Sequence, residues 1–487
     1  MSEYSYERMY SSVNEYVVEA AKKTPVIREV DVLVCGGGPA GFGAAYAAAQ
    51  NDAKTLLIER YASLGGGISS WLVTGMPSYQ IMPIPSYGLD KPIVSPPCAF
   101  PELIRRLGEM GGALLPADSE KYRPRGERAA STWTSLDPEL TKYMMQVMLD
   151  EVGVEILLHS IVVDAIVENN VIQGVIIENK SGRQAILAKM VIDATGDGDV
   201  AAAAEAPYEK AEVVNRPIGR LLPMTLDWRM TNADIDKALP VLSDGARMRR
   251  LIQEAMDKGE IPYIPAIRVL PESGNQLSTA NISMFNYGVL PKGKWHRKGE
   301  ISSFGPHIHG DCSEATDLTK AEIETREKIL PIVHLLRKNV PGCEDVYLSF
   351  TPYQIGLRES RRIIGEYFLT LEDEKHSRRH KDVICRVFMS GRIVTDLKGL
   401  FDIPYRCIVP LKIDNLFVAG RCISMDHEAA SYLEPREENT CMILGDASGT
   451  AAAQCIKEKV RPRELDVKLL QKKLKERGYS LKEDEVK

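Results

Sequence analysis

The sequence contains no uninterrupted apolar run of about 18 residues, the length at which a transmembrane helix becomes a candidate. Residues 1–23 are polar and rich in tyrosine, and they lack the apolar segment of a secretory signal peptide. We therefore expect neither a membrane span nor export, and a cytoplasmic location.

An excess of positive charge is also missing. The chain has 61 lysines and arginines against 67 aspartates and glutamates, a formal net charge of −6, and its basic residues are spread along its length. Proteins that bind nucleic acid generally carry a basic stripe that neutralises phosphates. We expect no nucleic-acid partner, which disfavours a tRNA-modifying enzyme, and we expect a small-molecule substrate.

Closely spaced cysteine pairs are absent too. The nine cysteines are scattered, and none forms a Cys-x-x-Cys pair. Reduced thiols packed in the core fit this pattern best. Cys407 and Cys422 are two that the fold can bring together, which leaves a redox role open for them.

One short segment contains several metal-ligand residue types, His307, His309, Asp311 and Cys312. These residues are crowded into a glycine-containing loop, and no matching pair stands elsewhere in the chain. We predict no metal. The two histidines are expected to line the mouth of a substrate site or to meet solvent.

A glycine-rich turn is the strongest positive signal. An apolar run at 30–34 precedes the turn at 36–41, an alanine-rich helix is predicted at 39–50, and a second apolar run stands at 55–58. Strand, glycine turn, helix and strand in this order form the opening unit of a dinucleotide-binding fold.

The turn fits the pattern G-x-G-x-x-G, and each of its three glycines has a physical role. Gly36 permits the tight turn, Gly38 lets the backbone approach a pyrophosphate, and Gly41 lets helix and strand pack closely. A helix that begins at Pro39 and Ala40 presents free N–H groups and a partial positive charge to the phosphates.

An acidic residue follows where a ribose would lie. Glu59 stands 18 residues beyond Gly41, at the end of the second apolar run and before Arg60. A carboxylate there accepts hydrogen bonds from ribose hydroxyls and disfavours a 2′-phosphate. The ligand is therefore predicted to be FAD or NAD.

Three further segments stand where they do in two-part flavoproteins, and this resemblance favours FAD. They are 64–67, with Gly65, Gly66 and Gly67; 193–199, with Ala194, Thr195 and Gly196; and 415–422, with Gly420 and Arg421. A final helix of small residues is predicted at 440–457. Its N-terminus, near Thr440 and Met442, is expected to point at the flavin edge where negative charge develops on reduction.

At these residues the sequence resembles the glutathione-reductase-type superfamily of FAD proteins, and specifically the bacterial FAD-dependent oxidoreductase family. The segments 354–367, 402–407 and 419–424 extend the resemblance over most of the chain. It implies an α/β fold, in which a Rossmann-like FAD-binding domain of the glutathione-reductase type carries an interleaved α+β substrate domain. It also implies noncovalent FAD, with Val162 contacting adenine through its backbone. The sequence departs from many superfamily members at Arg421, where an acidic residue usually approaches the ribityl chain.

The length predicts two or three domains. We divide the chain into a helical tail (1–28), the first part of the FAD-binding domain (29–205, with a loop insertion at about 77–130), a substrate or cap domain (206–395), the last part of the FAD-binding domain (396–460) and a second helical tail (461–487). The first tail is expected to pack on the body or on a sister subunit, so a homo-oligomer stays open.

The arginines at 358, 361 and 362 stand at helical spacing with Glu359 and Glu366. One interpretation is a salt-bridged helix in which Arg362 pairs with Glu366. The other is that Arg358 grips a substrate carboxylate or the flavin edge through its planar fork, with Glu359 beside it in the site.

His427 follows the segment expected near the flavin, so it is the candidate base that takes a proton as hydride leaves the substrate. A loop histidine bonded to the backbone is the alternative. No second G-x-G-x-x-G follows a strand, so oxygen, a quinone or a carrier is expected to accept the electrons. A flavin monooxygenase or halogenase, and a non-catalytic FAD-binding protein, remain alternatives.

Overall fold

The structure is a computed structural model that describes residues 17–83, 90–114, 133–210, 222–242, 244–263, 285–287, 299–390, 398–431 and 434–481. Most of the helix predicted in the first tail lies outside these ranges. Its described part, 17–25, forms no helix, and 26–28 belong to the first strand. The helical prediction is therefore wrong for that part, because the exposed valines at 17 and 18 meet no apolar surface.

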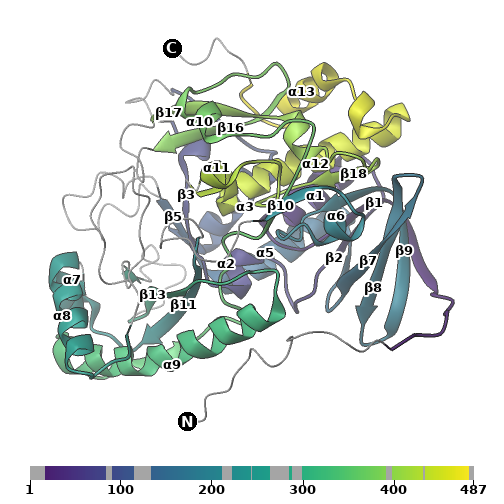
Figure 1. Cartoon of the computed structure of the whole chain (residues 1–487). Helices are drawn as coiled ribbons and strands as arrows, with labels where there is room; N and C mark the ends of the chain where they lie inside the picture. Colours follow the sequence, from purple (N-terminus) through teal and green to yellow (C-terminus); the bar gives the residue numbers. More distant parts are fainter. Residues whose placement is uncertain are drawn as a thin grey trace.

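A seven-stranded sheet forms the centre of the molecule (Figure 1). Its strands are, in spatial order, β6 (Glu155–Leu157), β2 (Thr55–Ile58), β1 (Val26–Cys35), β9 (Gly182–Asp193), β8 (Val171–Asn179) and β7 (Ile161–Glu168), with β18 (Leu416–Val418) also paired to β9. The pairs β6–β2, β2–β1, β1–β9 and β9–β18 are parallel, and β7–β8–β9 is antiparallel. The α/β fold predicted from the sequence is confirmed.

Strands β2 and β18 are fully buried and read as continuous apolar runs, as parallel strands covered on both faces do. Helix α1 (Pro39–Gln50) joins β1 to β2, so the predicted strand, turn, helix and strand unit is present. A hairpin turn at Asn169 and Asn170 joins β7 to β8, and both residues adopt positive φ, 50° and 62°.

Helix α12 (Glu438–Glu458) packs directly on the backbone of α1, and Figure 1 shows the two helices side by side. A Cβ added at Gly43 would stand 2.2 Å from the Met442 carbonyl oxygen. One added at Gly449 would stand 2.1 Å from the Ala44 carbonyl oxygen. The small residues of both helices are therefore required for this close approach. It fixes the first turn of α12 next to the first turn of α1.

Part of the insertion predicted as a loop at 77–130 is helical. Helix α3 (Ala99–Met110) buries Leu103 and Leu107 on the core and ends at Gly111, which has the left-handed φ of 75°. Proline-rich flanks concealed this amphipathic helix in the sequence. Residues 84–89 and 115–132 lie outside the described part.

A second hydrophobic cluster, drawn from residues 224–357, lies apart from the cluster around the main sheet. It is built on a four-stranded sheet in the order β12 (Phe285–Tyr287), β13 (Ile301–Ile308), β11 (Met224–Thr231) and β14 (Tyr347–Phe350), with helices α7 (Ile235–Leu242), α8 (Gly245–Asp257) and α9 (Ala315–Asn339). We call this sheet with its helices the cap unit. These boundaries favour a cap narrower than the 206–395 that we drew from the sequence.

The helix considered for 358–366 is absent, so that interpretation is wrong. Arg361–Ile363 is strand β15, paired antiparallel with β10 (Tyr208–Lys210). Extended backbone separates positions i and i+4 by about 13 Å, so Arg362 does not reach Glu366. Arg362 instead pairs with Glu359 and lies 3.6 Å from Glu209, while Glu366 pairs with Arg463 at 2.7 Å.

A buried ion pair attaches the end of the C-terminal helix α13 (Val467–Glu476) to α12, because Arg477 directly follows α13 and Asp446 lies in α12. Asp446 accepts two hydrogen bonds from Arg477, at 2.8 and 2.6 Å, and one from the backbone N–H of Ala99 at 3.0 Å. Removing the cation from a buried pair leaves an uncompensated charge, which costs about 3–5 kcal/mol. We expect Arg477→Met to lower the free energy of unfolding in urea by about that amount.

The matched control is Arg28→Met, because Arg28 pairs with Glu155 at 2.9 Å on the exposed surface. Exposed pairs contribute little, so this variant should unfold close to the wild-type midpoint. Equal stability losses in the two variants would show that the Asp446 pair does not hold the C-terminal segment in place.

None of the helices in the described ranges combines the length and the apolar character needed to traverse a lipid bilayer.

Candidate functional site

A large pocket opens at the carboxyl ends of the parallel strands β1, β2, β9 and β18, on the side facing the cap unit. It encloses about 1350 Å³, open solvent at its mouth included. Ligands of open α/β sheets bind at this end of the strands.

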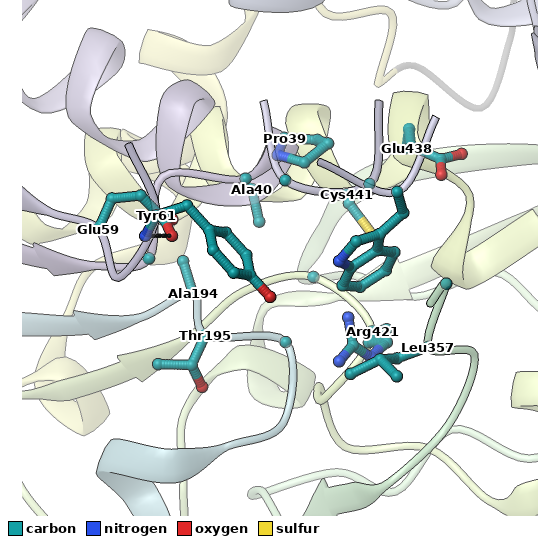
Figure 2. A pocket seen from close by; sticks show the side chains of 18 of the residues that line it. Pro39, Ala40, Glu59, Tyr61, Ala194, Thr195, Leu357, Arg421, Glu438 and Cys441 are labelled. Atoms are coloured by element: carbon teal, nitrogen blue, oxygen red, sulfur yellow. Dashed lines mark hydrogen bonds between the residues drawn. The ribbon is translucent and has the colours of Figure 1, made fainter. Parts of the chain in front are cut away.

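Most of the residues predicted to bind the cofactor line this pocket: Gly36, Gly38, Pro39, Ala40, Glu59, Arg60, Gly66, Gly67, Val162, Ala194, Thr195, Gly196, Gly420 and Arg421. Figure 2 shows several of them around the cavity, with Tyr61 reaching toward its middle. The site thus combines the turns after β1, β2, β9 and β18, which stand far apart in the sequence.

The glycine turn is shaped by close backbone contacts on one side and open space on the other. Gly36 has φ +106°, and a Cβ there would lie 2.4 Å from the Ala194 carbonyl oxygen. At Gly41 a Cβ would lie 1.7 Å from the Gly36 carbonyl oxygen. A Cβ at Gly38 would meet nothing nearer than 3.7 Å. Gly38 borders the pocket, and no side chain caps α1 there, so the first N–H groups of the helix are left for an anionic ligand.

Glu59 lies where the ribose was predicted. It is 5% exposed, and its carboxylate accepts hydrogen bonds from the N–H of Gly37 at 2.5 Å and of Tyr61 at 2.8 Å. These bonds fix the carboxylate at the pocket wall, and the remaining lone pairs are available to ribose hydroxyls. The same bonds hold the glycine turn against the end of β2.

We expect Glu59→Ala to weaken FAD binding about tenfold or more, because hydrogen bonds to charged groups contribute about 1.5–3 kcal/mol. Flavin retained after dialysis, and the dissociation constant from fluorescence titration of the apoprotein, measure this. Glu168→Ala, at an exposed position of β7, is the control. Unchanged affinity in Glu59→Ala would remove this carboxylate from the cofactor site.

The turn after β9 is held by a buried carboxylate that does not line the pocket. Asp193 accepts from the hydroxyl of Thr195 at 2.7 Å and from the N–H of Ala201 at 2.8 Å. Burial raises the pKa of Asp193 to about 6, against the opposing effect of these hydrogen bonds. The network fixes Ala194 and Thr195 at the pocket wall.

Arg421 is engaged within the protein. It forms an ion pair with the buried Asp197, and its guanidinium carbon lies 5.1 Å from the ring centre of Trp71. A Cβ at Gly196 would stand 2.5 Å from an Arg421 nitrogen. Arg421 therefore joins the turns after β9 and β18, while still bordering the pocket.

Four predicted cofactor residues do not border the pocket. Gly65 donates its N–H to the Gly37 carbonyl oxygen at 2.8 Å, and Gly41 packs under Gly36. Thr440, in the first turn of α12, and Met442, just after it, are fully buried and do not line the pocket. That turn meets the pocket through Glu438 and Cys441, both labelled in Figure 2.

Two of the three predicted catalytic residues also lie outside the pocket wall. His427, the first residue of α11 (His427–Ser431), places its Nδ1 2.8 and 2.9 Å from the two carboxylate oxygens of Glu359. Glu359 pairs in turn with Arg362. The structure thus brings His427 and Glu359 together, but in a hydrogen-bonded network with Arg362 that does not line the pocket.

Arg358, the third, borders the pocket. Its guanidinium carbon lies 5.0 Å from the ring centre of Phe304, and its Nη2 lies 3.5 Å from Nε2 of His307. No carboxylate among the described residues forms an ion pair with it. Burial and the nearby Arg436 lower the pKa of Arg358 to about 10, so the side chain stays charged at neutral pH.

The cap unit supplies a wall that the sequence analysis did not identify. Thr225 of β11 and Phe304 of β13 line the pocket, and Asp227 stands opposite Phe304 in the register of the two strands. The alternation along β11 is a signal that sequence analysis missed. Its residues in the core of the cap unit are apolar, namely Met224, Leu226, Trp228 and Met230. The residues that alternate with them are polar, namely Thr225, Asp227 and Arg229, and of these Thr225 lines the pocket.

All nine cysteines are free and buried, and burial raises the pKa of the Cys407 and Cys422 thiols well above the ordinary value. Neither thiol is poised to react as a thiolate. Within the described ranges, no three or more metal-binding side chains come together.

The fold and the pocket define a dinucleotide-binding protein of the two-part flavoprotein class. Residues 31–474 match the family of FAD dependent oxidoreductases, so the chain belongs to this family, and FAD is its cofactor. The residues fit that group, because the unfilled space at Gly38, the uncapped start of α1 and the carboxylate of Glu59 suit a pyrophosphate and a ribose without a 2′-phosphate.

The comparisons with individual proteins are more distant. Thiamine thiazole synthase of Methanococcus vannielii is 31% identical over 176 residues, which cover 34% of this chain and 56% of that protein. The enzyme of the same name from Sulfolobus acidocaldarius is 55% identical over 40 residues, 8% of this chain and 15% of that protein. The chain thus spans about half or less of the length of these curated relatives.

Among solved structures, a geranylgeranyl bacteriochlorophyll reductase-like protein from Thermoplasma acidophilum superimposes with a TM-score of 0.46 at 15% identity, covering 93% of this chain and 84% of that one. The p-nitrophenol 4-monooxygenase of Pseudomonas putida gives a TM-score of 0.42 at 11% identity, with 89% and 82% covered. These values carry no information on the substrate.

Proposed function

We propose that this FAD-dependent oxidoreductase oxidises a small organic anion, and that Arg358 holds the anionic group of the substrate at the pocket wall. The observation that carries the proposal is the guanidinium of Arg358. It borders the pocket and has no ion-pair partner among the described carboxylates. A partly buried cation without an ion-pair partner is costly, and a substrate carboxylate supplies such a partner through two parallel hydrogen bonds.

The surrounding charges support an anion. Burial raises the pKa of Asp227 and of Glu438 well above the ordinary carboxyl value, so both tend toward the neutral form. Arg358 and Arg436 line the same pocket, and guanidinium groups hold their proton. These two guanidinium groups place positive charge at this part of the pocket wall, which supports a negatively charged ligand there.

When bound, FAD supplies the acceptor for a hydride. The protein itself orients the substrate through Arg358 and covers it with Phe304 and the cap sheet. It also holds polar groups near the substrate, and these can take the proton that the substrate loses. His427 and Glu359 are proposed as positioning residues, because they border Arg362 and the segment that carries Arg358 rather than the pocket. Oxygen, a quinone or a protein carrier is proposed as the final electron acceptor.

The test is an anaerobic titration of the FAD-loaded protein with small carboxylates, alcohols, amines and the two nicotinamide dinucleotides. We expect one or more carboxylates to bleach the absorbance band of oxidised flavin. Bleaching by NADPH or NADH alone would assign the protein a nicotinamide-driven reaction instead. A purified protein that binds no flavin would contradict the account at its base.

A further inference from the structure

Three polar side chains of the cap sheet, one of which lines the pocket, have unfilled hydrogen-bonding capacity. Thr225, Asp227 and His307 are exposed by only 3%, 6% and 2%. Within the described part of the chain, Oγ1 of Thr225, Oδ1 of Asp227 and Nδ1 of His307 have no hydrogen-bond partner. A buried polar atom left without a partner costs about 1–3 kcal/mol, so three together call for a ligand.

The strand register places these groups on one face. Thr225 stands opposite His307 and Asp227 opposite Phe304, with a shift between the two pairs. Directly opposed residues of an antiparallel pair share a face. The shift accommodates three residues of β13 against two of β11, so His307 and Phe304 both point the same way as Thr225 and Asp227. Thr225 and Phe304 border the pocket, which assigns the face to it.

The loop that carries Arg358 is fixed to the same strand. The N–H of Thr225 donates to the Gly356 carbonyl oxygen at 3.0 Å, and the N–H of Gly356 donates to the Thr225 carbonyl oxygen at 2.8 Å. This bridge holds Arg358 two residues from the point where the loop meets β11. It also explains how Nη2 of Arg358 comes within 3.5 Å of His307, which faces Thr225.

We propose that Arg358, Thr225, Asp227 and His307 form a binding subsite for a 2-hydroxycarboxylate, in which Arg358 takes the carboxylate and the cap-sheet groups take the adjacent hydroxyl. The inference rests on the proposed function and names the substrate class within it. A hydroxyl both donates and accepts, as these groups require.

An uncharged hydroxyl fits better than an ammonium group. Burial raises the pKa of the Asp227 carboxyl well above its usual value, although Arg358 and Arg229 oppose the shift. Burial and the charge of Arg358 lower the pKa of His307 well below its usual value. Both shifts favour the uncharged forms of these side chains, so this face suits a hydroxyl better than an ammonium group.

The experiment compares two ligand pairs that differ by one hydroxyl, glycolate against acetate and 2-hydroxypropionate against propionate. Binding to the FAD-loaded protein is measured by calorimetry with the flavin first reduced by dithionite, so that no turnover occurs. We expect each hydroxy acid to bind about tenfold or more tightly than its partner. Equal binding within each pair would overturn the subsite.

Variants assign the preference to residues. In Thr225→Val and in Asp227→Leu, the ratio of the dissociation constants of acetate and glycolate should fall close to one. Asp227→Asn, which keeps a neutral donor and acceptor, should retain the preference. Thr231→Val, at the far end of the same strand, is the matched control and should behave as the wild type. Loss of the preference in Asp227→Asn equal to that in Asp227→Leu would contradict binding by a neutral Asp227.

The outcome separates this inference from the proposed function. If acetate and glycolate bind equally and both need Arg358, an anion site exists but the hydroxyl subsite is wrong. If neither binds and no carboxylate bleaches the oxidised flavin, the proposed function itself fails.

Discussion

Arg358→Met should lower kcat/KM by about 100-fold or more with the substrate that reduces the flavin, while FAD remains bound. Removing one partner of a buried, hydrogen-bonded charge pair costs about 2–5 kcal/mol. Methionine fills much of the space over Phe304 but offers no donor, so the loss reports the missing anion contact. FAD should be retained because Glu59 and the glycine turn lie elsewhere in the pocket.

Arg105→Met is the control, since Arg105 is an exposed residue of α3 that pairs with Glu102 and Glu109. Steady-state kinetics and the flavin-to-protein ratio are measured for both variants. Unchanged kinetics in Arg358→Met would remove this residue from the substrate site. A variant that purified without flavin would assign Arg358 to the cofactor instead.

Gly445→Ala should destabilise the protein by about 3 kcal/mol, at the upper end of typical overpacking, and weaken FAD binding with it. The added Cβ would stand 1.9 Å from the carbonyl oxygen of Ala40, a backbone atom that can move only with helix α1. Ala40 borders the pocket, so separating the helices displaces the start of α1 from the pyrophosphate position.

Gly108→Ala provides the matched control, because Gly108 is also a helical glycine and a Cβ there would meet nothing within 4 Å. Alanine is a better helix former than glycine, so this variant should be more stable by about 0.5–1 kcal/mol. Urea unfolding followed by circular dichroism measures both. A Gly445→Ala protein as stable as Gly108→Ala would contradict the backbone contact between α1 and α12.

The FAD-binding half of the fold was predictable because its signals are local. The turn at 36–41, Glu59 and the strand at 55–58 appear in the structure at their expected positions. Each depends on residues close together in sequence whose conformation has few alternatives, such as a glycine with φ +106° beside a buried strand. The start of α12 was placed within two residues for the same reason.

The substrate side was not predictable in the same way, because its partners are distant in sequence. The charge spacing of Arg362 and Glu366 suggested a helix, yet their partners are Glu209, Glu359 and Arg463. His427 follows a flavin segment in sequence, but its ring points to Glu359. An ion pair within a helix is determined by the spacing of two residues in the sequence. The ion pairs found here are determined by tertiary packing, which the spacing does not reveal.

The central claim is that the substrate reduces the flavin as an anion held by Arg358. The most direct measurement is the anaerobic rate of flavin reduction by the productive carboxylate and by its uncharged carboxamide, in the wild type and in Arg358→Met. The account predicts fast reduction by the carboxylate, reduction by the amide that is slower by about 100-fold or more, and little difference between the two in the variant. Equal rates for carboxylate and amide in the wild type would contradict it.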